Sequence, residues 1–244
     1  MKNNPASRMH RVLMTWKSVK PTDSAVAGWL RVFELESVQR NRDFVRVGYR
    51  LQLMLDELDL LREKLEGQSV SPASYQSTLA GLDNALSPSI LHAKAESVRQ
   101  YLTDGVYVGL GLCGELLPDE EEEITKDDFR EFVGLINELE LMLQDSSLPS
   151  SLVALIRRHI RQAELAVAQY PIRGAVALKD ALKYAVGDLA VEADAIRSAD
   201  SESANKVTRL WKKANDMADG AIKTDNIMQL GSRVVKFLTD VAGG

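Results

Sequence analysis

Three glycines have the spacing that, in other proteins, binds the pyrophosphate of a dinucleotide. Gly109, Gly111 and Gly114 form G-x-G-x-x-G inside the stretch VYVGLGLCGELL. This motif works only between a strand and a helix, because the amides at the helix N-terminus hold the phosphates. Here Pro118 follows four residues after the last glycine, and an acidic run begins at Asp119. We therefore predict no NAD or FAD site and no cofactor, and we expect the glycines to serve close packing or a bend.

The other residue types that do chemistry are isolated along the chain. It has one cysteine, Cys113, and three histidines, His10, His92 and His159. No histidine has a second ligand at metal-binding spacing, and a cysteine nucleophile needs a histidine and an acid close to it in space. The sequence therefore nominates no catalytic and no metal-binding residue. An enzyme with a site between helices around Cys113 stays open as an alternative.

Acidic residues run without interruption from 119 to 123 and recur at Asp127 and Asp128. The run lacks the glycine and the alternation of a calcium-binding loop. We expect a solvated loop, which would be favourable before a helix N-terminus. Thr125 and Asp128 have the spacing of a capping box and predict that a helix begins there.

The sequence pattern predicts that these residues lie on or between helices. Between Ser24 and Leu65, apolar residues recur in alternating steps of four and three, which is typical of a supercoiled helix with one apolar face. We call this face the seam. Its positions are Val26, Leu30, Phe33, Ser37, Arg40, Phe44, Val47, Leu51, Met54, Leu58, Leu61 and Leu65.

A continuous seam helix would be roughly 60 Å long at about 1.5 Å per residue. Ser24, or one of the two residues before it, is suited to cap its start, and Gly67 is suited to end it. The polar residues 39–43 are where we expect a kink or break. Arg40 places a charge in the seam, and because a buried charge is costly unless paired, we expect it to fix register or oligomeric state.

The rest of the chain shows shorter helical patterns and no sustained alternation typical of strands. It therefore predicts an all-α multi-helix bundle of about seven helices, with the long heptad-patterned helix near the N-terminus. The expected segments are a basic N-terminal arm (1–22), the long helix with a short one (23–87), a helical bundle core (88–199) and a C-terminal helical pair (200–244).

Composition is that of an ordinary globular protein. The 244 residues are 45% hydrophobic with a net charge of -5, and the single cysteine allows no internal disulfide. The first residues contain no apolar stretch of a signal peptide, and the longest uncharged apolar run, 105–114, is too short to span a membrane. We expect a cytoplasmic protein.

Basic residues form three clusters: residues 2–20 with Trp16, a four-residue repeat on the seam helix, and a group after Pro149. Interleaved acids and a pI of about 5.4 favour solvated faces over a nucleic-acid surface. The candidate anion contacts are Lys17, Lys20, Arg42, Arg46, Arg50, Arg157, Arg158 and Arg161. An amphipathic segment from Asn226, with Arg233 and Lys236, is expected to dock on the bundle or to lie on a membrane surface.

Together these patterns predict a non-enzymatic helical interaction or scaffold protein. It would self-associate or bind a partner protein through the seam, and no small-molecule ligand is evident. One alternative is an effector or regulator that contacts a membrane or nucleic acid through the basic arm and the C-terminal helix. That alternative rests on analogy with helical accessory proteins of bacterial defence or toxin systems.

Overall fold

The structure, a computed structural model, describes residues 2–144, 148–192 and 201–222. Within these residues it contains ten α-helices and no strand, which confirms the all-α prediction. The expected number of about seven was low because two helices went unrecognised, at residues 5–14 and 104–116, and because the seam helix is divided in two. The predicted C-terminal segment from Asn226, with Arg233 and Lys236, lies outside the described residues.

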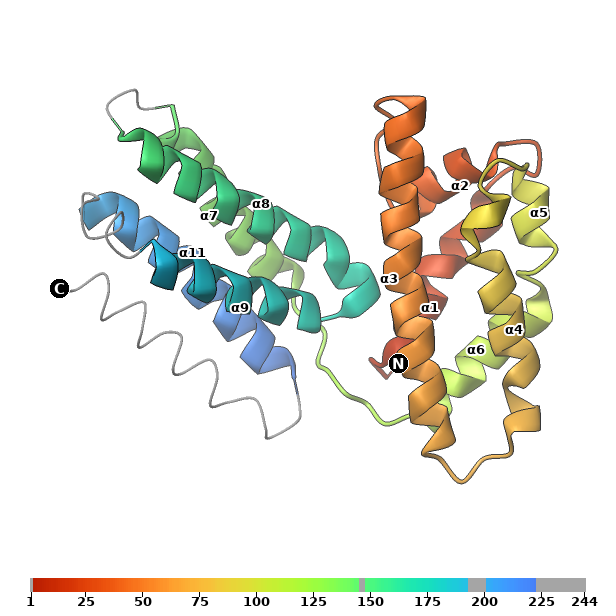
Figure 1. The fold of residues 1–244 in the computed structure, drawn as a ribbon. Helices are drawn as coiled ribbons and strands as arrows, with labels where there is room; N and C mark the ends of the chain where they lie inside the picture. The colour runs from red at the N-terminus through yellow and green to blue at the C-terminus, as the bar shows by residue number, and fades with distance from the viewer. Residues whose placement is uncertain (1, 145–147, 193–200, 223–244) are drawn as a thin grey trace. The chain divides into compact units, whose positions relative to one another are not determined.

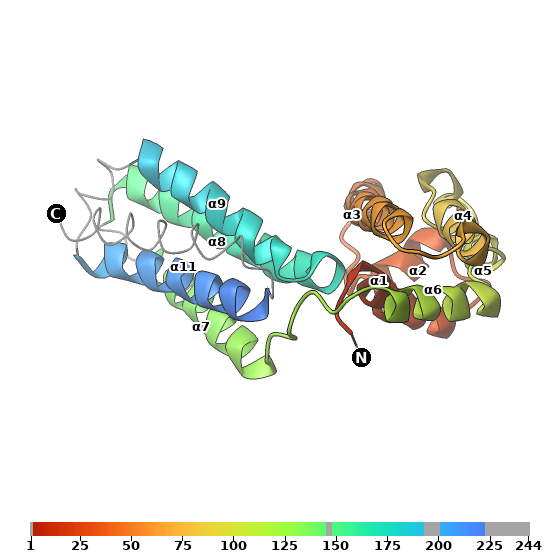
Figure 2. The same cartoon turned by 90° about the horizontal axis from the view of Figure 1, so that it is seen from below.

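The chain divides into two compact units, Met1–Asp119 and Glu120–Gly244 (Figures 1 and 2). Unit 1 holds α1 (Pro5–Met14), α2 (Ala25–Val32), α3 (Arg40–Glu66), α4 (Gln76–Ala85), α5 (Ala95–Arg99) and α6 (Asp104–Leu116), with 3-10 turns η1 (Thr15–Ser18), η2 (Pro72–Ser74) and η3 (Pro88–Ile90). Unit 2 holds α7 (Lys126–Met142), α8 (Ser150–Arg173), α9 (Val176–Val191) and α11 (Ser201–Ala221). The division falls inside the segment 88–199 that we had expected to form one bundle core.

The expected basic arm is a core helix instead. α1 begins at a cap in which Asn4 accepts a hydrogen bond from the Ser7 amide, and it packs on α3 and α6. Met9 and Leu13 are fully buried. Arg8, one of the expected arm cations, is buried and lies 2.8 Å from Glu57 in an ion pair. The prediction of a basic arm is wrong because the apolar residues of this segment recur at helical spacing, and their burial outweighs the effect of the basic residues.

Two helices replace the single helix expected over residues 24–65. Ser24 caps α2 as predicted, but α2 ends at Val32 and α3 begins at Arg40. The Leu35 amide donates to the Leu30 carbonyl at 2.8 Å, and Glu34 adopts a left-handed φ of 53°, an arrangement that closes many helix ends. The break therefore lies N-terminal to the polar stretch 39–43, most of which forms the first turn of α3.

The C-terminal half of the seam belongs to the core. α3 packs on α1, α2 and α4. The seam residues of this half are all fully buried: Val47, Leu51, Met54, Leu58, Leu61 and Leu65. This part of the seam is thus covered by the chain itself, and it offers no free surface to a second molecule. Gly67 caps the end of α3 as predicted.

The glycine-rich stretch is one helix, α6, so it lacks the strand that a dinucleotide motif requires. A Cβ at Gly109 would overlap the hydroxyl of Thr78 on α4, and a Cβ at Gly114 would lie 2.7 Å from the Ser7 hydroxyl on α1. Close packing is therefore confirmed at Gly109. It does not hold at Gly111, which faces open space, or at Gly105, whose nearest atom belongs to Thr103.

The described residues of unit 2 form four long helices around one apolar cluster that includes Phe132, Leu178 and Trp211. The predicted capping box is present, because the Asp128 amide donates to Thr125 Oγ1 at 3.1 Å. α8 continues to Arg173 and ends at Gly174, whose φ is 64°. Pro171 therefore lies inside α8 and does not end it.

The acidic connection between α6 and α7 is partly buried, contrary to the expected solvated loop. Glu121 is buried, and it accepts a hydrogen bond from the Ala175 amide at 3.0 Å, next to the start of α9. Asp119 accepts one from the Asn3 amide at 2.8 Å, next to the start of α1. These carboxylates therefore satisfy amides near helix N-termini that have no partner inside their own helix.

Among the described helices, none has the length and hydropathy needed to cross a membrane.

Candidate functional site

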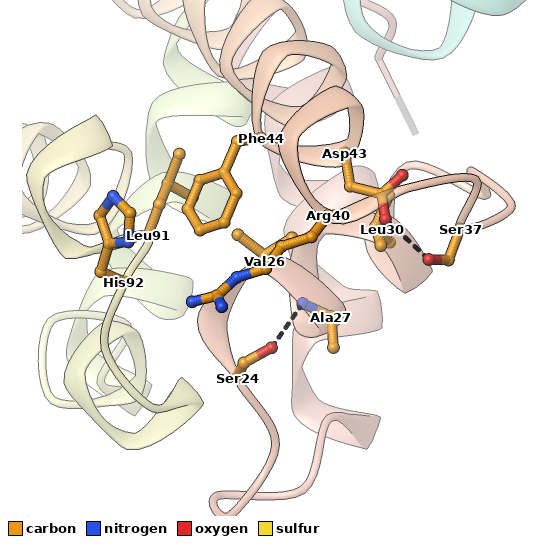
Figure 3. Close-up of a pocket in the computed structure, with 10 residues that line it drawn as sticks. All are labelled: Ser24, Val26, Ala27, Leu30, Ser37, Arg40, Asp43, Phe44, Leu91 and His92. Carbon is orange, nitrogen blue, oxygen red and sulfur yellow. Dashed lines mark hydrogen bonds between the residues drawn. The ribbon is translucent and has the colours of Figure 1, made fainter.

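A pocket opens in unit 1 where α2 and α3 separate (Figure 3). Its volume is about 380 Å³. Its walls come from α2, the α2–α3 connection, the start of α3 and the segment before α5. They are formed by Ser24, Val26, Ala27, Leu30, Ser37, Arg40, Asp43, Phe44, Leu91 and His92. Five of these positions belong to the N-terminal half of the seam, so this half is not filled as the C-terminal half is.

The apolar part of the pocket combines aliphatic and aromatic walls. Val26, Leu30 and Leu91 are buried and form the aliphatic side. The rings of Phe44 and His92 stack at 4.5 Å between centroids, with 27° between their planes. The stack joins α3 to the segment that precedes α5, and thus links two parts of the chain that are almost 50 residues apart.

The one carboxylate of the pocket is already occupied by donors from the protein. Asp43 accepts hydrogen bonds from the Ser37 hydroxyl at 2.7 Å and from the Val38 amide at 3.0 Å. Arg46 lies 3.9 Å from it. The Ser37 bond, followed by the Val38 bond, lowers the pKa of Asp43, so this carboxylate stays charged. Asp43 therefore holds the α2–α3 connection against α3 and is not free to bind a ligand.

Arg40, in contrast, has no hydrogen bond or ion pair with any residue that the structure describes. Its side chain extends across the pocket in Figure 3, and it is exposed. The expectation of a buried seam charge that fixes register is therefore wrong. The helix break makes Arg40 the first residue of α3, at the rim of the pocket rather than in a helix interface.

Two further donors face the pocket. The Ser24 oxygen accepts the Ala27 amide at 3.2 Å as the cap of α2, which leaves its hydroxyl proton available. The His92 ring stacks on Phe44, and its nitrogens make no hydrogen bond to described residues. The pocket thus offers donors to a ligand, while its one acid already accepts hydrogen bonds from the protein.

The candidate anion contacts of unit 1 do not gather on one surface. Lys17 lies 3.7 Å from Asp104 and over the ring of Tyr107. Lys20 and Arg42 are exposed. Arg46 donates to the Glu36 carbonyl at 2.6 Å, and Arg50 is buried, which lowers the pKa of its guanidinium. The expected stripe of Arg42, Arg46 and Arg50 is therefore not a row of free charges.

The third basic cluster is divided in the same way. Arg158 forms ion pairs with Asp188 at 3.1 Å and Glu192 at 3.3 Å, and the Asp188 bond raises the pKa of Arg158. Arg157 and Arg161 are exposed. One of the three cations thus ties α8 to α9, and only the other two face solvent.

Of the remaining seam positions, Phe33 is half-buried at the end of α2. Its ring stacks on Trp29, with 5.3 Å between centroids and 15° between planes. Trp29 in turn packs on Trp16 of η1, with 4.5 Å between their centroids. Phe33 therefore belongs to an aromatic group of unit 1 and does not line the pocket.

Of the residues considered for catalysis, His92 lines this pocket, while Cys113 and His159 do not. Cys113 is buried, which raises the pKa of its thiol and disfavours the nucleophilic thiolate. His159 is buried in unit 2, where its Nδ1 accepts the Trp211 indole N–H at 2.9 Å. Within the described ranges, no group of three His, Cys, Asp or Glu side chains is placed to hold a metal ion.

A second pocket, of about 230 Å³, lies between the start of α7 and the end of α11. Its lysine is already paired with carboxylates. Lys213 donates to Asp128 at 2.8 Å and to Glu131 at 2.6 Å, and the Asp128 bond raises the pKa of Lys213. This pocket offers less to a ligand than the one in unit 1, where a cation is left without a partner.

Sequence reasoning had nominated Val26, Leu30, Ser37, Arg40 and Phe44 as positions of one seam. It missed Leu91 and His92, which no local pattern connects to α3. One signal was present, because the two polar interruptions of the seam, Ser37 and Arg40, lie at the break itself. Comparison with protein-family models, curated proteins and solved structures finds no match to this chain.

Proposed function

We propose that this chain is a cytoplasmic, non-enzymatic interaction protein that binds a segment of a partner protein in the pocket between α2 and α3. The supporting observation is the unfilled half of the seam. Val26 and Leu30 of α2 and Phe44 of α3 hold seam positions, like the residues that the chain buries further along α3, but here they line an open cavity. An apolar concave site with a few polar groups is the usual form of a binding site.

A protein segment suits this pocket better than a free small molecule. Half of the ten lining residues are exposed, among them Ser24, Ala27 and His92. Small-molecule sites commonly bury about 70–90% of their ligand, which so open a rim does not favour. A peptide also continues beyond the cavity, where Val38 is 64% exposed and offers further apolar contact.

Burial of the C-terminal half of the seam argues against the self-association through the seam that the sequence led us to expect. The seam residues from Val47 to Leu65 are covered within the chain, so a second copy would have to use another surface. Nucleic acid and anionic membranes are not proposed as partners, because the described basic side chains are dispersed. Arg8 and Arg158 in particular are engaged in ion pairs.

The test fills the pocket without removing any side chain that packs. Ala27 is exposed on its rim, so Ala27→Trp blocks the cavity and leaves the core intact. Ala80→Trp is the matched control, because Ala80 is also exposed, lies on α4 and does not line the pocket. Peptides selected from a random library on the full chain are measured by fluorescence anisotropy against all three proteins.

We expect the selected peptides to bind the wild type and Ala80→Trp alike, and to bind Ala27→Trp at least tenfold more weakly. Equal binding to both tryptophan variants would show that the pocket is not the site. Light scattering measures the oligomeric state and tests whether a second copy of the chain occupies the pocket. A stable dimer that Ala27→Trp dissociates would make the occupant a second copy of the chain rather than a partner.

A further inference from the structure

We infer that the pocket recognises a carboxylate side chain next to an aliphatic one, with Arg40 as the partner of the carboxylate. The inference rests on the proposed function, since it names the chemistry of the segment that the same pocket would bind. It depends on an imbalance of charge and hydrogen-bonding groups around the cavity.

The imbalance begins at Arg40. Its guanidinium lies across the cavity with no acceptor from the described chain, while Asp43 already accepts from the Ser37 hydroxyl (Figure 3). Asp43 also accepts from the Val38 amide. A planar guanidinium pairs with a carboxylate through two parallel hydrogen bonds. As the first residue of α3, Arg40 also lies at the positive end of a 27-residue helix.

The other available groups point to the same ligand. Ser24 has a hydroxyl proton to donate, and a ring N–H of His92 can also donate. The strongest acceptor among the lining side chains is the carboxylate of Asp43, and it already accepts hydrogen bonds from Ser37 and Val38. A ligand rich in acceptors therefore gains more here than one rich in donors, such as a lysine side chain.

The apolar walls define the second half of the ligand. A cavity of ~150 Å³ is enough to hold benzene in another protein, so about 380 Å³ has room for an aliphatic side chain and a carboxylate together. Val26, Leu30 and Leu91 supply an aliphatic surface, and the Phe44–His92 stack closes it on one side. A leucine beside a glutamate meets both requirements.

A phosphorylated segment fits less well. Phosphate-binding sites of this kind generally use clusters of arginines to match the larger charge. Only one arginine lines this cavity, and its neighbour Arg46 is directed to Asp43 and to the Glu36 carbonyl. The observations therefore favour a carboxylate, and phosphate becomes an outcome of the test.

The experiment uses four blocked hexapeptides, acetyl-Gly-Ser-Leu-X-Ser-Gly-amide, in which X is Glu, Gln, Lys or phosphoserine. Binding to the full chain is followed by NMR through the His92 ring signals and the backbone amides of α3. The variants are Arg40→Gln and, as the control, Arg42→Gln, because Arg42 is exposed near the start of the same helix but does not line the pocket.

We expect the Glu peptide to bind up to about fivefold more tightly than the Gln peptide, which is the upper end for an exposed ion pair, and the Lys peptide to bind most weakly. Arg40→Gln should remove the difference between Glu and Gln, and Arg42→Gln should keep it.

If Glu and Gln peptides bind equally to wild type but lose binding in Ala27→Trp, the pocket is a docking site and the charge assignment is wrong. Tighter binding of phosphoserine overturns the carboxylate. No binding of any peptide to wild type, together with no library selection, overturns both proposals.

Discussion

Glu34 adopts a backbone conformation that glycine usually supplies at the end of a helix. Its φ of 53° lies in the left-handed region, which costs a residue with a Cβ roughly 1–2 kcal/mol. We expect Glu34→Gly to stabilise unit 1 by about 1 kcal/mol or less, because a glycine also increases the entropy of the unfolded chain. Urea unfolding of the full chain, followed through the indole N–H signals of Trp16 and Trp29, measures this change.

Glu36→Gly is the control, since it removes the same charge from the same connection at a residue without a positive φ. It should lower the stability of unit 1 or leave it unchanged. A similar gain in both variants would mean that loss of negative charge, and not relief of the backbone, is the cause.

His159 makes the stability of unit 2 dependent on pH. Burial, helped by the nearby Arg158, lowers its pKa to about 4 despite the opposing effect of Asp188, compared with about 6.5 in an unfolded chain. The unfolded state therefore binds the proton first. The stability contributed by neutral His159 is complete above pH 6.5 and is lost as the pH falls toward 4, by on the order of 3 kcal/mol in total.

Urea unfolding at several pH values, read from the indole N–H signal of Trp211, tests this expectation. His159→Gln is the comparison, because its amide oxygen can accept the Trp211 proton and does not titrate. The variant should be less stable at pH 7, with a smaller loss between pH 6.5 and pH 4. An unchanged pH dependence in the variant would assign the effect to other groups.

At the scale of elements, two glycines of α6 differ in the space around them. A Cβ at Gly109 would overlap Thr78, while at Gly111 it would meet nothing within 4 Å. Gly109→Ala should therefore destabilise unit 1 by about 1–3 kcal/mol through overpacking. Gly111→Ala should stabilise it by up to about 1 kcal/mol through helix propensity. Thermal unfolding of the two variants decides this, and equal shifts would show that α4 does not limit α6 at Gly109.

The seam illustrates what a periodic sequence can and cannot establish about elements. The pattern correctly indicated helices, and it correctly placed Ser24 and Gly67 at their ends. The polar residues 39–43 led us to expect a break slightly too far along the chain. The periodicity itself did not place it, because the connection between α2 and α3 has a length that preserves the four-three steps from Phe33 through Ser37 to Arg40. Periodicity reports which face a residue shares along a helix, and it does not show that the backbone is continuous.

The candidate site was predictable to a similar extent. Val26, Leu30 and Phe44 were recognised as apolar positions with a common partner, and the partner they meet is a cavity. Leu91 and His92 reach it through tertiary packing, since Ala25 and Ala95 donate their amides across to the carbonyls of Ala93 and Asp23. Such contacts depend on how distant segments pair, for which a single sequence carries no local signal.

At the scale of the molecule, two units of similar size each enclose their own apolar core. The first and last residues of unit 1 are joined by hydrogen bonds. Asn4 donates to the Gly114 carbonyl at 2.9 Å and to the Pro118 carbonyl at 3.2 Å, and the Asn3 amide donates to Asp119 at 2.8 Å. The last residues of the unit thus satisfy the start of α1, which explains why the boundary follows Asp119 and not the end of α6.

We therefore expect residues 1–119, expressed alone, to fold and unfold cooperatively, because the segment contains its own core and the acceptors for its own first helix. Residues 1–116 should be less stable by at least about 2 kcal/mol, since they lack Asp119, the Pro118 carbonyl and the buried side chain of Leu117. Urea unfolding followed by circular dichroism compares the two segments, and amide spectra show whether 1–119 retains the signals it has in the full chain. If 1–119 is unfolded, unit 1 depends on the rest of the chain for its stability. If both segments are equally stable, the contacts after α6 do not contribute to closing the unit.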